Sequence, residues 1–322
     1  MTRPSQRPVH SVLDLIGNTP MVRLGHIGGG DAADIYAKLE YFSPGLSVKD
    51  RIGVGMIARA ERDGLLSKGG TIIEPTAGNT GVGLALAGVQ MGYRVILCVP
   101  ENFSIEKREV MRALGGELVL TPADGGIKGA IEKAEELARD IPNSYVPQQF
   151  RNPYNSESHY ETTAPEIWEQ MDGQIDAFVT GAGSGGTFAG VARFLRERMG
   201  GQVWCAIVEP QGSVLGGGQP GPKEVEGIGA SFIPPVLDME LADEVITIPD
   251  DPAFAMVGRL AKEEGILGGS SAGANVAAAL QVAQRLGAGK RVVTIIPDTS
   301  ERYMSKGIFS KWRKETTADP TV

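Results

Sequence analysis

Apolar residues recur along the chain in two alternating patterns, short continuous runs and longer stretches with helical spacing. The continuous runs predict buried strands at 35–39, 71–74, 94–99, 117–120, 175–180, 203–209 and 291–296. The longer stretches predict helices at 48–62, 79–91, 104–114, 127–139, 186–199, 252–264 and 272–286. Strands that alternate with helices in this way are typical of parallel βαβ units with right-handed crossovers. We therefore expect an α/β fold, and we expect the less regular segment 142–161 to be where the chain crosses between two domains.

Composition narrows the classes of function. The net charge of −8, with no visible Lys/Arg cluster, argues against nucleic-acid binding and against anionic membranes. No run approaches the roughly 18 apolar residues of a membrane span. Cys98 and Cys205 lie inside apolar runs without a redox spacing, which fits a reducing cytoplasm. The three histidines have no metal-ligand spacing, so we expect no metal site.

Lys49 is the first candidate for chemistry. It follows the strand at 35–39 and a Ser-Pro-Gly turn, and it lies in the first turn of the helix predicted at 48–62, with Ser47 as the expected N-cap. The positive end of the helix dipole and the neighbouring Arg51 both disfavour the charged form of this lysine. A lysine that forms a Schiff base near neutral pH needs such an environment. The alternative is a solvated charged face formed by Lys49, Asp50 and Arg51.

Three glycine-rich loops are each predicted to follow an apolar strand and to open a helix, where open α/β sheets bind ligands. In the clearest, 181–187, free amides, a threonine hydroxyl and a helix N-terminus suit a phosphate monoester. Gly186 stands where a P-loop needs lysine, but Glu209 lies about 20 positions on, as a dinucleotide fingerprint requires. Spacing alone leaves three interpretations open: a phosphate site, a dinucleotide site and a simple tight turn.

The other two loops suit the remaining parts of a small ligand. In the loop 74–81, Thr and Asn side chains with free amides suit a carboxylate and a ring hydroxyl, although such a loop also serves as an N-cap. If this loop and 181–187 face one sheet edge, a ligand site is favoured. The loop 268–273 offers neutral hydroxyls at another expected strand-to-helix junction, and these suit a heterocyclic nitrogen that is not to be protonated.

A lysine, a phosphate cradle and neutral hydroxyls together suit one cofactor, pyridoxal 5′-phosphate. From residue 11 to about residue 308, the sequence resembles the cysteine synthase and cystathionine β-synthase family of fold-type II pyridoxal-phosphate enzymes. The motifs that carry the resemblance are Gly17-Asn18-Thr19-Pro20, Ser47-Val48-Lys49-Asp50-Arg51, Thr76-Ala77-Gly78-Asn79-Thr80-Gly81, Gln148-Gln149-Phe150, Gly183-Ser184-Gly185-Gly186-Thr187, Glu226-Gly227-Ile228-Gly229-Ala230 and Pro297-Asp298-Thr299-Ser300-Glu301-Arg302-Tyr303.

The resemblance implies an architecture. We expect two three-layer αβα domains with mostly parallel twisted sheets and the cofactor in the cleft between them. The smaller domain would span 40–151 and carry the loop that binds the substrate carboxylate. The larger domain would comprise 1–39 and 152–322 and carry the phosphate-binding loop.

The resemblance also implies a role for each motif residue. Lys49 would be the Schiff-base lysine and the base that removes and returns the α-proton. Asn79 would bond the 3′-oxygen of the cofactor ring, and Ser271 would face the ring nitrogen. The phosphate would be held by the loop Gly183, Ser184, Gly185, Gly186 and Thr187. The substrate would be bound by Thr76, Ala77, Gly78, Thr80 and Gln149 at its carboxylate, with Gly227 and Gly229 shaping the loop over its amine.

The expected reaction is β-replacement on O-acetyl-L-serine or another activated L-serine, through an aminoacrylate intermediate. Homocysteine as nucleophile gives cystathionine, and sulfide gives cysteine. Cysteine synthases usually have Ser where this chain has Ala77. That difference, with Val225-Glu226-Gly227, Asp298 and the run from Ser300 to Lys306, is closer to the bacterial branch of O-acetylserine-dependent cystathionine β-synthases. Plain cysteine synthase is the alternative.

Partners and a rival function complete the expectations. We expect amino-acid and thiol or sulfide substrates, a homodimer, and a serine acetyltransferase C-terminus as a further candidate partner, because a cleft that grips a carboxylate also captures a peptide C-terminus. The rival function is a nucleotide-binding oxidoreductase that uses the loop 181–187.

Overall fold

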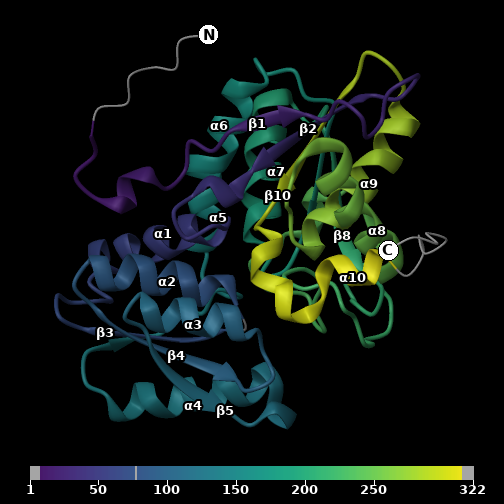
Figure 1. Cartoon of the computed structure of the whole chain (residues 1–322). Helices are drawn as coiled ribbons and strands as arrows, with labels where there is room; N and C mark the ends of the chain where they lie inside the picture. Colours follow the sequence, from purple (N-terminus) through teal and green to yellow (C-terminus); the bar gives the residue numbers. More distant parts are fainter. Residues whose placement is uncertain (1–7, 77, 314–322) are drawn as a thin grey trace.

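Two sheets form the frame of the molecule, whose computed structural model describes residues 8–76 and 78–313 (Figure 1). The strand order is β1-β2-β10-β7-β8-β9 in the six-stranded sheet and β5-β4-β3-β6 in the four-stranded sheet. Within these sheets only the pair β1–β2 is antiparallel. The strands are β1 (Met21–Arg23), β2 (Asp34–Leu39), β3 (Thr71–Pro75), β4 (Arg94–Pro100), β5 (Glu117–Thr121), β6 (Ser144–Tyr145), β7 (Ala177–Gly181), β8 (Trp204–Pro210), β9 (Glu244–Ile248) and β10 (Arg291–Ile296).

The seven predicted helices are confirmed, with ends that differ by a few residues, whereas the short helices α5, α6 and α10 were not predicted. They are α1 (Lys49–Arg62), α2 (Asn79–Gln90), α3 (Ile105–Ala113), α4 (Gly126–Asp140), α5 (Tyr154–Ser158), α6 (Ala164–Gln170), α7 (Gly186–Met199), α8 (Asp250–Arg259), α9 (Ser270–Leu286) and α10 (Ile308–Arg313). The helix predicted at 252–264 is α8 followed by a π-helical turn, Leu260–Glu264. The segment 142–161, expected to be irregular, contains β6 and α5.

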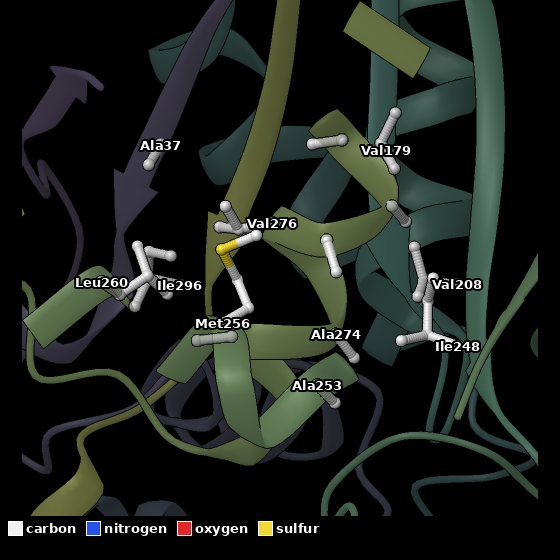
Figure 2. Close-up of a cluster of buried hydrophobic side chains, with 14 of the residues drawn as sticks. Ala37, Val179, Val208, Ile248, Ala253, Met256, Leu260, Ala274, Val276 and Ile296 are labelled. Carbon is white, nitrogen blue, oxygen red and sulfur yellow. The ribbon is translucent and has the colours of Figure 1, made fainter. Parts of the chain in front are cut away.

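The six-stranded sheet is covered on both faces because alternate residues of its strands point to opposite sides. In β7, Ala177 and Val179 pack in one apolar cluster with α8 and α9, whereas Phe178 packs in the other with α6 and α7. Figure 2 shows the first cluster, in which Met256 and Val276 lie near Ile296 of β10. This half of the molecule is therefore three layers, helix on sheet on helix.

The four-stranded sheet is built in the same way. Leu97 of β4 packs with α1 and α2 on one face, and the neighbouring Ile96 and Cys98 pack with α4 on the other. The expectation of two three-layer αβα units with mostly parallel sheets is confirmed. The four-stranded sheet uses residues between 71 and 145, inside the predicted smaller domain, while the domain boundaries at 40 and 151 stay a prediction.

Three strands, β1, β6 and β9, were not among the predicted runs; β1 and β6 have only three and two residues. β9 lies at the edge of the six-stranded sheet, and only two of its five residues are buried. A continuous apolar run marks a strand that is buried on both faces, so a half-exposed edge strand gives a weaker signal. Within the described ranges, no helix has the length and apolar character that crossing a membrane requires.

Candidate active site

Lys49 is the first residue of α1, and it is half-buried. The expected N-cap is wrong: the cap position is Val48, although the Ser47 hydroxyl still accepts the Lys49 amide at 3.3 Å. Burial lowers the pKa of the Lys49 amine, and the nearby carboxylates of Asp298 and Glu40 oppose that shift. Desolvation therefore favours a neutral amine here.

Arg51 does not contribute to that lowering, contrary to the expectation from sequence. Its guanidinium bonds to both oxygens of Glu40 at 2.7 and 2.9 Å and to both oxygens of Glu166 at 2.7 Å. Asp50 and Arg51 are buried, so the alternative of a solvated charged face is excluded. The run after Lys49 is instead a structural part of the site.

The loop 181–187 joins β7 to α7 and forms one wall of a pocket that also contains Lys49. Two glycines in it are required by geometry. Gly185 has a φ of +90°, which other residues rarely adopt, and a Cβ on Gly183 would lie 2.3 Å from the carbonyl oxygen of Gly227. The loop thus exposes its backbone amides at the N-terminus of α7, beside the lysine.

Two residues that the sequence analysis did not assign support this loop from α5 and the π turn His159–Thr163. Asn155 donates its side-chain amide to the Ser184 hydroxyl at 2.9 Å and to the Gln149 carbonyl at 2.7 Å. His159 is fully buried, and its Nε2 lies 3.2 Å from the Thr187 hydroxyl. Burial, and after it the positive charge of Arg51, holds the pKa of His159 well below its usual value, so the ring is neutral.

Asn79, at the start of α2, contacts Asp298, which follows β10 of the six-stranded sheet. Its Nδ2 donates to Oδ2 of Asp298 at 2.6 Å, and its buried Oδ1 has no protein partner among the described residues. The Tyr303 hydroxyl donates to the same Asp298 oxygen at 2.5 Å. The side chain of Asn79 is thus held by protein on one side only and has bonding capacity left for a ligand.

The loop 74–81, after β3, is hydrogen-bonded to the segment that contains Gln149. The Thr80 hydroxyl donates to Gln149 Oε1 at 2.7 Å, and the Thr76 hydroxyl accepts the amides of Gly78 and Gly81 at 3.2 and 3.1 Å. All three side chains are buried. The prediction for Ala77 lies outside the described residues.

Glu74, near the end of β3, connects this candidate carboxylate site to the segment at Gln149, and the sequence analysis gave it no role. Its carboxylate accepts the amides of Gln148 at 2.9 Å and Gln149 at 3.2 Å. Burial raises its pKa to about 7, although these two amide bonds act in the opposite direction. The sequence signal that could have found it is an acidic residue at the end of the apolar strand predicted at 71–74, directly before Pro75.

The third loop does not follow a strand, contrary to expectation. The stretch before α9 comes from the π turn Leu260–Glu264, and only an isolated bridge pairs Gly268 with Thr299. Ser271 is buried in the first turn of α9, and its hydroxyl would lie 3.8 Å from a Cβ on Gly227. Gly227 lines the pocket of Lys49, so Ser271 still borders the predicted cofactor position.

Gly229 has a different place from Gly227. Its amide donates to the Ala182 carbonyl at 2.8 Å, and a Cβ on it would lie 2.6 Å from a side-chain carbon of Pro210. It therefore packs this loop on the larger sheet.

The loops 74–81 and 181–187 do not face one sheet edge, because they follow β3 and β7, which belong to different sheets. They are linked indirectly. Asn155 bonds both Ser184 of one loop and the carbonyl of Gln149, and the side chain of Gln149 accepts the hydroxyl of Thr80 in the other loop.

Glu209, the acidic residue that left a dinucleotide site open, is already engaged. It is buried, and its oxygens accept the amides of Leu215 and Gly216 at 2.9 and 3.2 Å and the Thr247 hydroxyl at 2.9 Å. A carboxylate used in this way cannot bind a ribose, so the structure disfavours the nucleotide-binding oxidoreductase.

Comparison with known proteins gives a consistent set of relatives. The family model described as pyridoxal-phosphate dependent enzyme matches residues 12–298. A cysteine synthase of Staphylococcus aureus is 47% identical over 308 residues, which cover 95% of this chain and 99% of that protein. An O-acetylserine dependent cystathionine beta-synthase of Bacillus subtilis is 48% identical over 301 residues, which cover 94% and 98%. The crystal structure of the Helicobacter pylori O-acetylserine dependent cystathionine beta-synthase superposes with a TM-score of 0.89 at 48% identity, covering 94% of this chain and all of that one.

Proposed function

The chain belongs to the family of pyridoxal-phosphate dependent enzymes, and from that premise we propose that it catalyses β-replacement on O-acetyl-L-serine or another activated L-serine. The incoming sulfur comes from homocysteine, which gives cystathionine, or from sulfide, which gives cysteine. The single observation that carries the proposal is the half-buried, desolvated Lys49 amine in one pocket with the glycine loop 181–187.

The residues around this pocket fit pyridoxal phosphate. Its phosphate suits the amides of the loop at the α7 N-terminus, and Thr187 adds a hydroxyl. Asn79 has a free, buried side-chain oxygen near Asp298, and the neutral Ser271 hydroxyl suits the ring nitrogen. When bound, the cofactor supplies a carbonyl carbon for an amine and an electron-poor ring that stabilises negative charge at the substrate α-carbon.

Lys49 performs the proton transfer. Because burial lowers the pKa of its amine, a neutral nitrogen is available both to bond the cofactor carbonyl and to take the proton from the α-carbon. The same nitrogen later returns a proton to that carbon. Asp298 and Glu40 partly offset the burial, so the amine stays basic enough to accept a proton.

The loop around Thr76 and Thr80, together with Gln149, orients the substrate carboxylate. Thr80 and Gln149 are already bonded to each other, and Glu74 holds the backbone of Gln149 in place. Ala77 and Gly78 complete this set in the proposal, and Gly227 and Gly229 shape the loop above the substrate amine.

The bonds exchanged are a carbon–oxygen bond for a carbon–sulfur bond. The oxygen leaves as acetate with the bonding electron pair, the sulfur supplies a new pair to the β-carbon, and the thiol proton is released. A neutral hydroxyl at the ring nitrogen makes the cofactor a weaker electron sink than a carboxylate would, which favours prompt loss of a good leaving group such as acetate.

Both nucleophiles are supported by relatives of nearly equal identity, one a cysteine synthase and one an O-acetylserine dependent cystathionine beta-synthase. We test the choice directly. Purified holoenzyme receives O-acetylserine with sulfide and homocysteine in competition, and the ratio of cysteine to cystathionine is measured. The proposed function fails if O-acetylserine is consumed with neither nucleophile. A homodimer, a serine acetyltransferase partner and a cytoplasmic location stay predictions.

Lys49→Ala tests the role of the lysine. We expect the rate to fall by several orders of magnitude, because no other amine lies in this part of the described pocket. Steady-state kinetics on O-acetylserine give the loss, and borohydride treatment followed by mass spectrometry shows whether cofactor is still attached to the chain. The control is Lys68→Ala, an exposed lysine beyond the end of α1. Unchanged turnover in Lys49→Ala would contradict the proposal.

A further inference from the structure

Three charged side chains without a role in the chemistry above meet in the structure. Lys306 Nζ lies 2.6 Å from Oε1 of Glu226, and Lys107 Nζ lies 3.3 Å from Oε2 of the same carboxylate. Lys107 comes from α3, Glu226 from the loop just before Gly227, and Lys306 from the end of the 3-10 segment Ser300–Lys306. We call Lys107, Glu226 and Lys306 the charged cluster.

The charged cluster lies beside both parts of the candidate site. A Cβ on Gly78, in the carboxylate loop, would lie 3.4 Å from Lys107 Nζ. Glu226 precedes the pocket residue Gly227, and its amide donates to the Ser270 hydroxyl at 3.0 Å, one residue before Ser271. The cluster therefore lies between the loop that binds the first substrate's carboxylate and the predicted cofactor position.

The burial of these side chains increases toward the site. The exposed fraction is 39% for Lys306, 21% for Glu226 and 4% for Lys107. The Lys107 ammonium also lies 4.1 Å from the centre of the Tyr303 ring, which holds it in place. Burial acts to raise the pKa of Glu226, but Lys107 and Lys306 outweigh it, and the pKa is lowered.

The cluster thus holds two positive groups and one negative group next to Gly227, a residue that lines the pocket. An α-amino acid carries one group of each sign, and charge-assisted bonds to a carboxylate and an ammonium are strong when partly buried. Sulfide carries neither group. We propose that the charged cluster binds the ammonium and carboxylate of an amino-acid thiol, with Glu226 on the ammonium and Lys107 and Lys306 on the carboxylate.

This inference rests on the proposed β-replacement and names the class of its second substrate. Glu226 and Lys306 also belong to the motifs that set this sequence apart from common cysteine synthases, and they are 80 positions apart in the chain. Because Glu226 and Lys306 pair directly, these two motifs meet at one place in the fold. There they would select a thiol that is itself an amino acid.

The test uses the holoenzyme and four nucleophiles that differ in their charged groups. L-Homocysteine carries both groups, 3-aminopropane-1-thiol lacks the carboxylate, 4-sulfanylbutanoate lacks the amine, and sulfide lacks both. In the unaltered enzyme we expect homocysteine to have the lowest KM of the three organic thiols, by about tenfold or more.

Lys107→Gln should raise the KM for homocysteine and for 4-sulfanylbutanoate about tenfold, and leave the KM for sulfide and 3-aminopropane-1-thiol within about twofold. Glu226→Gln should raise the KM for the two thiols that carry an amine, homocysteine and 3-aminopropane-1-thiol. Lys128→Gln, at an exposed lysine of α4, is the matched control. Thermal melting of each variant shows whether the fold is retained, and Lys306→Gln gives a second, more exposed variant should Lys107→Gln fail to fold.

The outcomes separate the inference from the function on which it rests. Equal losses with all four nucleophiles would show that the cluster only bridges the two units, and would overturn the inference. Turnover of sulfide without turnover of homocysteine would also overturn it, while β-replacement would stand. No consumption of O-acetylserine with any nucleophile would overturn the proposed function itself.

Discussion

Desolvation is the main cause of the pKa shifts of Lys49 and Glu74, two residues of the candidate site. Lys49 has its pKa lowered and Glu74 has its pKa raised to about 7, and in both the largest cause is loss of water. Arg51, two residues from Lys49, has no such effect because Glu40 and Glu166 neutralise it. The sequence neighbour is therefore a poor guide to electrostatics, since desolvation depends on the whole surrounding fold.

Glu74→Gln should make stability less dependent on pH. The folded pKa of Glu74 is about 7 and its ordinary value is 4.5, so the folded state holds the proton more tightly. The unfolding free energy is therefore full below 4.5 and falls as pH rises toward 7, by roughly 3 kcal/mol. Glutamine cannot ionise, so this loss disappears.

Urea unfolding at pH 5 and pH 8 measures the effect of Glu74→Gln. The difference in unfolding free energy between the variant and the unaltered protein should shift in favour of the variant from pH 5 to pH 8, whatever that difference is at pH 5. Glu132→Gln, at an exposed position on α4, is the control and should show no such gain. Parallel pH profiles for Glu74→Gln and the unaltered protein would contradict the assignment.

The loop 181–187, the proposed phosphate site, depends for its shape on a second element. α7 and the glycines before it present the amides, while α5 and the π turn His159–Thr163 hold the loop's side chains through Asn155 and His159. A neutral histidine can bond the Thr187 hydroxyl without adding a competing charge. The π turn thus helps to place a hydroxyl at the N-terminus of α7.

Thr187→Val should weaken cofactor binding about tenfold or more and cost about 1–3 kcal/mol of stability, because Nε2 of the buried His159 loses its partner. The change removes one hydroxyl donor to the phosphate and keeps the shape of the side chain. Fluorescence titration of the apoprotein with pyridoxal phosphate gives the Kd, and thermal melting gives the stability. The control is Thr162→Val, which removes a helix hydroxyl that bonds the Ser158 carbonyl. An unchanged Kd with a lowered Tm would show a purely structural hydroxyl.

The two units of the molecule are joined by a buried ion network as well as by the pocket. Arg51 of α1 pairs with Glu40, which follows β2, and with Glu166 of α6, while the fully buried Lys38 of β2 pairs with Glu166 at 2.8 Å. Two cations and two carboxylates balance in charge. The network fixes the start of α1, and therefore Lys49, relative to the larger sheet.

Glu166→Gln should destabilise the whole molecule. Burial acts to raise the pKa of Glu166, but Arg51 and then Lys38 outweigh it and lower the pKa to about 2. The stabilisation is therefore full above 4.5 and is lost as pH falls toward 2. Allowing for the partial exposure of this carboxylate, its loss should cost about 2 kcal/mol at pH 7, or about 3 °C in Tm.

Calorimetry at pH 7 checks the prediction for Glu166→Gln. Glu169→Gln, an exposed glutamate on the same helix, should leave Tm unchanged. A decrease in Tm for Glu166→Gln no larger than for the control would show that the network contributes nothing to stability.

Local pattern determined the α/β class, most strands and helices, and the main candidates Lys49, Asn79 and 183–187. These were predictable because burial of a strand or of a helix face imposes a period on nearby residues. The resemblance carried over the further candidates, such as Thr76, Gln149 and Ser271. Only the tertiary structure showed the edge strand β9 and the assignment of the two ligand loops to different sheets.

The tertiary structure also decided which residues support the site. Glu74, Asn155 and His159 act through bonds to residues 28 to 75 positions away, and Glu226 meets Lys107 across 119 positions. No local period records such pairs, because each joins segments that are far apart in the chain, and the pair of Glu226 and Lys107 also joins the two units. Burial, and with it the pKa of Lys49, is set by the meeting of those units, whereas the chain alone specifies only which side chains are available for it.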